Sequence, residues 1–297
     1  MRYRILHTTL YEYAAPVTVS HHTARLHPRQ DRRQKCHGYS LDITPHPTLR
    51  TSRDDFFGNC VSAFSIQQIH SRLEITATSD VEVLEAAPPS LQASLPWEEV
   101  VELFGETTPV ELLDAYQFIF ESPSIRCSPE LAELARPCFQ PGRPLLECAR
   151  ELNQLIHREF KYDSKATTVA TPLQDVLADR RGVCQDFAHI AIAGLRSLGL
   201  PARYVSGYVR THALEGGRRL VGADASHAWF SVFAPGTGWV DFDPTNDLMP
   251  GTEHITLGYG RDFSDLSPVS GMIVGGGDHV AKVAVDVKPV GDDVRSL

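Results

Sequence analysis

One stretch of the chain, residues 179–208, restricts the possible folds more than any other. It reads DRRGVCQDFAHIAIAGLRSLGLPARYVSGY. Its apolar residues recur at helical spacing and predict a helix with one buried stripe; they are Phe187, Ile190, Ala191, Gly194, Leu195 and Leu198. Gly199 follows the last turn and Pro201 cannot continue the helix, so the helix is predicted to end there. Residues 202–209 then read as a strand, which predicts a helix packed against a sheet.

Cys184 stands at the first turn of this helix, just after the flexible Gly182. Free backbone N–H groups and the positive end of the helix dipole favour a thiolate over a thiol at that position. A cysteine that opens a buried helix is therefore well placed to act as a nucleophile. The alternative is a small apolar residue that fills the helix start, and residues later in the chain decide between the two.

The segment SHAWFSVFAPGTGWVDFDPTN predicts a hairpin, because two alternating runs flank the turn APGTG. If Phe233 faces Trp239 across the turn, Trp229 faces Asp243. His227 then lies one diagonal step from Asp243 on the same face of the hairpin. The hairpin is therefore expected to aim the imidazole and the carboxylate at each other.

A second aspartate, Asp241, shares this face but lies opposite Ser231, farther from the histidine. Pro244 ends the returning strand, which leaves the carboxylate of Asp243 at the end of the sheet. Asp243 is therefore the better partner for the imidazole.

A cysteine at a helix start, with a histidine and an aspartate that face each other, is typical of a thiol acyl-transfer enzyme. The thiolate attacks a carbonyl carbon and forms a thioester, the imidazole accepts and returns the proton, and the carboxylate fixes the imidazole tautomer. Backbone N–H groups at the helix start can hold the developing oxyanion. The predicted catalytic residues are Cys184, His227 and Asp243.

Residues 1–88 are predicted to form an amino-terminal β domain. Short alternating runs are separated by turn signals, among them Pro45 and the pair Gly58-Asn59. Such a pattern favours an antiparallel β-sandwich. Pro16 is expected to break the first run.

Residues 89–297 are predicted to form the catalytic domain, with its core at about 145–262. A proline-bearing connector, AAPPSLQASLP, precedes a helical pattern. Helices are predicted over 97–104, 110–120, 129–135 and 144–160. Ser128 suits an N-cap, and Pro129 and Pro144 suit first-turn positions.

The composition is that of a soluble globular chain of 297 residues with a formal net charge of −9. This charge, without a dense basic run, argues against a nucleic-acid partner. The amino terminus lacks the apolar stretch of a secretory signal, and no segment is apolar enough to span a membrane. We therefore expect a cytoplasmic protein without a membrane partner.

The six cysteines are expected to be reduced thiols, because a chain of this length without a signal peptide rarely relies on disulfides. No CxxC pair occurs, so a structural zinc site has little support. His21, His22 and His27 cluster near Cys36, but their spacing fits no ligand pattern. No metal or other cofactor is expected.

Three segments resemble the motifs of the transglutaminase-like superfamily in its bacterial branch: GVCQDFAH, SHAW and WVDFDPTN. The amino-terminal strands with their FGN turn are similar to the β domain that precedes the core in that branch, and HITLGYGRDFSDLSP is similar to its tail motif. The resemblance spans nearly the whole chain and implies a papain-like α+β core, in which the cysteine helix packs on an antiparallel sheet. It matches Cys184 to the nucleophile, His227 to the base and Asp243 to the orienting acid.

Together these features predict an enzyme that forms a thioester from a glutamine or peptide amide, with a peptide or protein as substrate. Water would release the acyl group, as in a peptidase or amidase, or an amine would capture it, as in a transglutaminase. The superfamily also contains non-catalytic relatives, so the alternative is a binding or assembly module. A metal site built from the same three residues is less favoured, because a hydrogen-bonded triad explains them without a metal.

Other residues near the three have structural roles that compete with functional ones. His189 lies one and a half turns after the cysteine, which favours a hydrogen-bonded structural histidine. Tyr162 either reaches the oxyanion or packs in the core, and Gln185 is expected to be a helix-start residue. Trp229 and Trp239 are expected to pack. In the tail, His254, Arg261 and Asp262 are predicted to be surface or loop-fixing residues.

Overall fold

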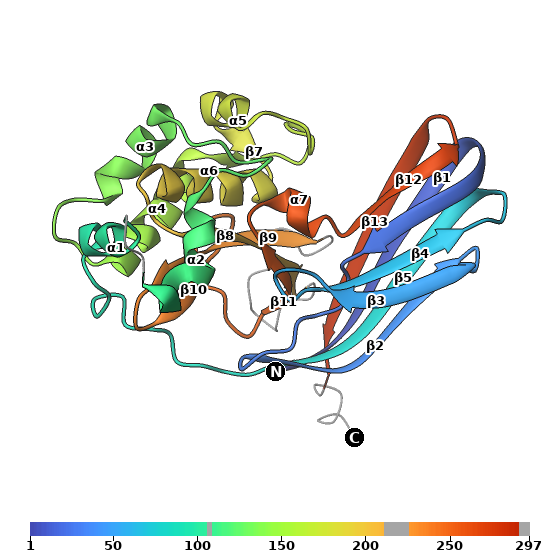
Figure 1. The fold of residues 1–297 in the computed structure, drawn as a ribbon, viewed down its shortest axis with the longest axis horizontal. Helices are drawn as coiled ribbons and strands as arrows, with labels where there is room; N and C mark the ends of the chain where they lie inside the picture. Colours follow the sequence, from blue (N-terminus) through green and yellow to red (C-terminus); the bar gives the residue numbers. More distant parts are fainter. Residues whose placement is uncertain (106–108, 211–225, 291–297) are drawn as a thin grey trace, which may run out of the picture.

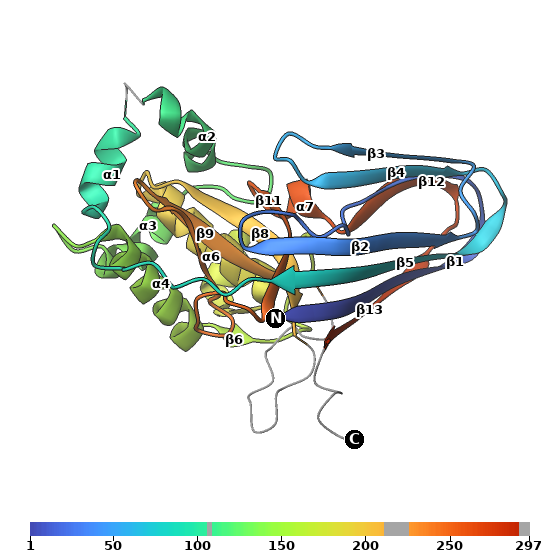
Figure 2. The same cartoon turned by 90° about the horizontal axis from the view of Figure 1, so that it is seen from below.

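The computed structural model describes residues 1–105, 109–210 and 226–290. Its elements form an all-β body of long strands and, beside it, an α+β body in which helices cover one face of a short sheet (Figures 1 and 2). The predicted α+β fold class, an antiparallel β domain followed by a mixed core, is confirmed. Within the described ranges, no helix combines the length and apolar character needed to cross a membrane.

Seven antiparallel strands form the sheet of the β body. They are β1 (Arg2–Ala24), β2 (Gln34–Thr44), β3 (Leu49–Asp54), β4 (Cys60–Ile66), β5 (His70–Val83), β12 (Val269–Gly275) and β13 (His279–Pro289). The order is β2-β5-β1-β4-β3, and β12 and β13 also pair with β1. The first half of β1 pairs with β5 and β13, and its second half pairs with β4 and β12.

Pro16 does not end β1, contrary to the sequence prediction. The strand continues through it, and the β1–β5 ladder shifts register there, so the missing N–H falls at an irregularity. Because β1 changes partners, the two ends of the sheet enclose a common core. Phe64 of β4 packs in that core with Leu41 of β2 and Ile75 of β5. The predicted sandwich is thus built from one continuous sheet.

The strands β12 and β13 belong to the β body, which corrects the predicted assignment of all of residues 89–297 to the second domain. Residues 17–24 of β1 pair with β12, and residues 3–13 pair with β13. Three glycines at 275–277 join the two strands with φ of 93°, 85° and 60°, which glycine adopts without steric cost. The chain therefore begins and ends in the same sheet.

The helical block of the second body contains α1 (Trp97–Leu103), η1 (Val110–Leu112), α2 (Leu113–Tyr116), η2 (Gln117–Ile119), α3 (Pro129–Ala135), η3 (Arg136–Cys138), α4 (Leu145–Glu159) and α5 (Leu173–Asp179). Ser128 caps α3 as predicted, because its side chain accepts from the N–H of Leu131. Pro144 is the N-cap of α4 rather than its first helical residue. The single helix predicted over 110–120 is three short helical turns.

The central element is α6 (Cys184–Ser197), which packs on a four-stranded sheet. That sheet has the order β10-β9-β8-β11, formed by β8 (Ala202–Val209), β9 (His227–Ala234), β10 (Gly238–Phe242) and β11 (His254–Gly260). The sequence predicted one buried stripe on α6, but residues 186–196 are all buried. The reason is that α3, α4 and α5 contact α6 as well as the sheet does. The helix ends at Ser197 with Leu198 as its C-cap, and Gly199 follows the last turn as predicted, with φ of +81°.

Side-chain amides of the β body protect the edge strand β11. Gln34 accepts from the N–H of Thr256 at 2.8 Å and donates to its carbonyl at 2.9 Å. Asn59 does the same with Tyr259, at 3.0 and 2.8 Å. Unpaired N–H and C=O groups of an edge strand are thereby satisfied, and the two bodies are joined.

Candidate active site

Cys184 is the first residue of α6 and is partly exposed. The carboxylate of Asp186 fixes this helix start, because it accepts from the N–H of Val183 at 2.8 Å and from the hydroxyl of Thr167 at 2.6 Å. A Cβ at position 182 would lie 2.6 Å from the same carboxylate, so Gly182 is required for this close approach. The short strand β7 (Arg181–Gly182) leads into the helix and pairs in parallel with β6 (Lys161–Tyr162).

The hairpin of β9 and β10 has the predicted register. Phe233 pairs with Trp239, and Ser231 pairs with Asp241. Asp243 follows the last residue of β10, and its Oδ2 lies 2.8 Å from Nε2 of His227. The predicted contact between the imidazole and the carboxylate is therefore present.

Asp243 is a buried carboxylate that accepts several hydrogen bonds. Its Oδ1 accepts from the backbone N–H groups of Thr245 and Asn246, at 2.9 and 3.2 Å. Its Oδ2 accepts from Nδ2 of Asn246 at 2.8 Å and from Nε2 of His254 at 3.1 Å, besides His227. Burial opposes the charged form, but the charge and hydrogen bond of His227, followed by those of His254, hold the pKa of Asp243 well below its ordinary value. The carboxylate is thus ionised and held in one orientation.

His227 is buried at the start of β9 and uses only one ring nitrogen within the described chain. Nε2 donates to Asp243, whereas Nδ1 has no hydrogen-bond partner there. Burial opposes protonation, but the charges of Asp243 and Cys184 and the hydrogen bond from Nε2 to Asp243 outweigh it and raise the pKa of His227 to about 10. The ring is therefore a cation at neutral pH, with Nδ1 free for the thiol side of the site.

His254 was missed by the sequence prediction, which made it a surface or loop-fixing residue. It is buried at the start of β11 and contacts Asp243 directly. A signal was available, because the tail motif opens with this histidine at the first position of an alternating run. Asn246 lies within the segment WVDFDPTN, and the sequence does not predict its role, in which both its backbone N–H and its side-chain amide donate to Asp243.

Asp262 and Arg261 lie in the same tail. Asp262 is buried and caps α7 (Phe263–Leu266) by accepting from the N–H of Ser264, so its loop-fixing role is confirmed and its surface placement is wrong. Arg261 pairs with Asp265.

The structural role predicted for His189 is confirmed. Its Nε2 accepts from the N–H of Phe263 at 3.2 Å, and burial lowers its pKa to about 4. Tyr162 packs edge-on against Phe187 and is 38% exposed, with Cys184 close enough to raise the pKa of its hydroxyl in addition to burial. Gln185 lies in the first turn of α6, as predicted.

The two tryptophans of the hairpin pack as predicted. Trp229 is fully buried and its ring contacts His254 edge-on, with the centroids 5.3 Å apart. Trp239 packs edge-on against Phe233 and Phe118.

A metal could be held by His227, Asp243 and His254, whose ligand atoms lie within 4.8 Å of one another. Both imidazole Nε2 atoms are directed at the carboxylate oxygen between them, however, so the hydrogen bonds account for this cluster without a metal. It is also a different set from the cysteine-containing one that the sequence suggested. In the part of the chain that the structure describes, His21, His22, His27 and Cys36 do not form such a group.

Comparisons with known proteins cover nearly the whole chain. Residues 3–82 match the family described as the bacterial transglutaminase-like N-terminal region, and residues 132–244 match the transglutaminase-like superfamily. The uncharacterized protein Rv2569c of Mycobacterium tuberculosis is 40% identical over 98% of this chain and 94% of its own length. A protein-glutamine gamma-glutamyltransferase of Pseudomonas aeruginosa is 33% identical, over 43% of this chain and 21% of its own length.

Among solved structures, a candidate cysteine protease from Cytophaga hutchinsonii is similar over 99% of this chain and 92% of its own, with a TM-score of 0.74. The two sequences are 24% identical, so the similarity shows a shared fold.

Proposed function

Because the chain belongs to the transglutaminase-like superfamily, we propose that it is a thiol enzyme whose catalytic residues are Cys184, His227 and Asp243. The observation that carries the proposal is the state of His227. Its Nε2 is held by Asp243 at 2.8 Å, and its Nδ1 is left without a partner in the described chain. An imidazole bound on one side by a carboxylate and free on the other is the arrangement that a thiol nucleophile requires.

The proposed first step is acyl transfer from an amide to Cys184. The sulfur attacks the carbonyl carbon, the C–S bond forms, and the C–N bond breaks. The leaving amine takes a proton from His227. This ring carries the proton at neutral pH because its pKa is raised. Backbone N–H groups at the start of α6, including that of Cys184, would stabilise the oxyanion.

The second step releases the acyl group from the thioester. Water or an amine attacks the carbonyl carbon, its proton passes to His227, and Cys184 leaves as a thiolate. Asp243 keeps the imidazole in one tautomer through both steps. The substrate class that we propose is a glutamine side chain or a peptide amide. This follows the names of two similar proteins, a protein-glutamine gamma-glutamyltransferase and a candidate cysteine protease.

The test is the mass of the protein after exposure to a library of glutamine-containing peptides at neutral pH. An acyl adduct on Cys184 that disappears in Cys184→Ala supports the proposal. Adding a primary amine separates the two outcomes, because transfer yields an amide product and hydrolysis yields a free acid. A protein that binds the peptides with neither adduct nor product is instead a binding or assembly module.

A further inference from the structure

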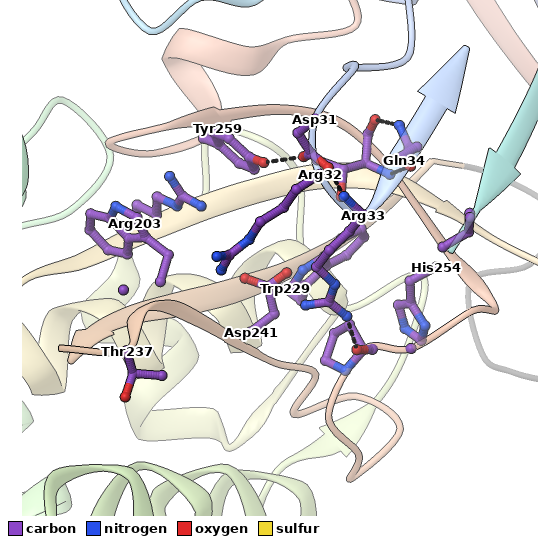
Figure 3. Close-up of a pocket in the computed structure, with 16 residues that line it drawn as sticks. Asp31, Arg32, Arg33, Gln34, Arg203, Trp229, Thr237, Asp241, His254 and Tyr259 are labelled. Atoms are coloured by element: carbon purple, nitrogen blue, oxygen red, sulfur yellow. Dashed lines mark hydrogen bonds between the residues drawn. The ribbon is translucent and has the colours of Figure 1, made fainter. Parts of the chain in front are cut away.

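A pocket of about 530 Å³ lies between the two bodies, on the face of the short sheet that points away from α6. Ala202 and Tyr204 face the core that contains α6, so Arg203 between them points to the opposite face. The loop between β1 and β2 supplies Arg32 and Arg33 to the other wall (Figure 3). We refer to this space as the interdomain pocket. Cys184 is not among the residues that line it.

Three arginines, Arg32, Arg33 and Arg203, line the interdomain pocket, although the net charge of the chain is −9. Arg203 lies between two aromatic rings, 3.6 Å from the centre of Tyr259 and 4.3 Å from that of Trp239. It makes no salt bridge with any described residue, although the charge of Asp241 acts on it from beyond salt-bridge distance, and burial lowers its pKa to about 10. A largely buried cation without a directly bound anion is unfavourable, so an anion in the pocket would stabilise it.

Arg32 and Asp241 are also available to a ligand. The side chain of neither makes a hydrogen bond or ion pair within the described ranges, and the guanidinium of Arg32 reaches across the pocket toward Asp241 in Figure 3. The side chains of the two residues that flank Arg32 already make hydrogen bonds within the protein. Arg33 donates to the carbonyl of Pro250, and Asp31 accepts from the hydroxyl of Tyr259. Two cations without an ion pair, Arg32 and Arg203, and one such anion, Asp241, therefore face the same space.

We propose that the interdomain pocket binds a small amino carboxylic acid, with its carboxylate on Arg32 and Arg203 and its amino group on Asp241. A guanidinium presents a planar pair of N–H donors that matches a carboxylate. Asp241 disfavours a phosphate, which carries more negative charge and no cation. A volume of about 530 Å³ is within the range of small-molecule sites and accommodates a free amino acid or the end of a short peptide.

Tryptophan fluorescence is a direct probe of this pocket. Of the three tryptophans in the chain, Trp229 and Trp239 line it and Trp97 lies on α1. The experiment uses the full-length Cys184→Ser protein, so that binding is separated from any acyl transfer and does not depend on the proposed function. The probes are the twenty amino acids singly, L-alanyl-L-alanine, acetate and inorganic phosphate.

We expect a saturable fluorescence change with at least one amino acid or with the dipeptide, and at least ten-fold weaker binding of acetate and phosphate. A free amino acid that binds where the dipeptide does not identifies the free acid as the ligand, and the converse identifies a peptide end. Arg32→Gln and Asp241→Asn should each weaken binding by about ten-fold or more, an effect typical of losing one charged contact. Arg53→Gln, which changes an exposed arginine of β3, should leave the affinity unchanged.

Three results would overturn the proposal. They are the lack of saturable binding by every amino acid and the dipeptide, binding that survives both pocket substitutions, and phosphate binding that equals or exceeds that of the amino acids.

Discussion

Nε2 of His254 lies 3.1 Å from Oδ2 of Asp243, the same oxygen that accepts from His227. Two imidazoles from different strands thus hold one carboxylate, and Asn246 adds a third donor to that oxygen. A carboxylate held from several sides cannot rotate away from His227. We therefore interpret His254 as a positioning residue, which acts on the proposed catalytic base only through Asp243.

The first prediction concerns His254. His254→Ala removes one hydrogen bond to a buried carboxylate, worth about 1.5–3 kcal/mol. Since only part of that energy orients His227, we expect about a ten-fold slower acylation of Cys184, equivalent to roughly 1.4 kcal/mol. His254→Gln should restore part of the rate, because its amide N–H can occupy the position of Nε2. The exposed His46 supplies the control, His46→Ala. Equal rates for the alanine and glutamine variants would show that only packing matters at this position.

The second prediction concerns Asp243. Asp243→Asn should keep the fold and disturb the imidazole tautomer. In serine triads the matching change costs about four orders of magnitude in rate. A thiol depends less on this partner because a Cys–His pair is already partly ionised, so we expect a loss of about ten- to a thousand-fold. The measurement is acylation by an activated ester, with circular dichroism to verify folding. Asp42→Asn on the exposed edge of β2 is the control, and an unchanged rate for Asp243→Asn would exclude the assigned role.

The contact between His227 and Asp243 could be predicted from the sequence because both residues belong to one hairpin. The turn length sets the register, and strict alternation decides which side chains share a face. His254 could not be placed in the same way. Its strand, β11, pairs with β8, and the hairpin of β9 and β10 lies between these two strands in the sequence. Alternation predicts that such a strand exists, but it does not predict which strand pairs with it.

The same limit explains the domain boundary. The sequence predicts strands near the carboxyl terminus, but each of their pairings with β1 spans 245 residues or more, the shortest joining Ala24 to Val269, and has no local signature. The interdomain pocket depends on this arrangement as well, because its walls come from the β1–β2 loop and from β8 and β10. Arg203 reads in the sequence as one strand residue among others. Only the packing of the two bodies reveals that its charge is buried.

The third prediction is selective alkylation of Cys184 by iodoacetamide near neutral pH. Burial raises the pKa of the other five thiols, to about 12 for Cys138 and about 11 for Cys148. Cys184 is partly exposed at a helix start, and its charge interacts favourably with the cationic His227. Both features favour a reactive thiolate. Rates for each residue follow from peptide mass spectrometry at several pH values. If Cys184 reacts no faster than Cys36 or Cys127 at pH 6, it is not the nucleophile.

The fourth prediction concerns the contact between the two bodies. Asn59→Ala removes the hydrogen bonds to the N–H and the carbonyl of Tyr259 and leaves both groups of the edge strand unsatisfied. Since an unsatisfied buried group costs about 1–3 kcal/mol, we expect the free energy of unfolding to fall by about 2–4 kcal/mol. Urea unfolding measures this difference. Gln67→Ala, at an exposed position, should change the free energy of unfolding by less than about 0.5 kcal/mol, and a similarly small effect of Asn59→Ala would refute the role of this contact.

The fifth prediction is the acid dependence of stability. The folded chain keeps Asp243 ionised at a pKa well below the unfolded value of about 3.9. This group therefore contributes stability that is present above pH 4 and is lost as the pH falls, because the unfolded chain then binds a proton that the folded chain does not.

In Asp243→Asn neither the folded nor the unfolded chain has this titrating carboxyl group. Below pH 4 the difference in free energy of unfolding between the original protein and the variant should therefore narrow as the pH falls, by up to about 1.4 kcal/mol per pH unit. Urea unfolding of both proteins from pH 6 to pH 3 measures the difference, and the Asp42→Asn control should follow the original protein throughout. A difference that stays constant down to pH 3 would mean that Asp243 titrates alike in the folded and unfolded chains, and that the hydrogen bonds from His227 and His254 do not hold its charge.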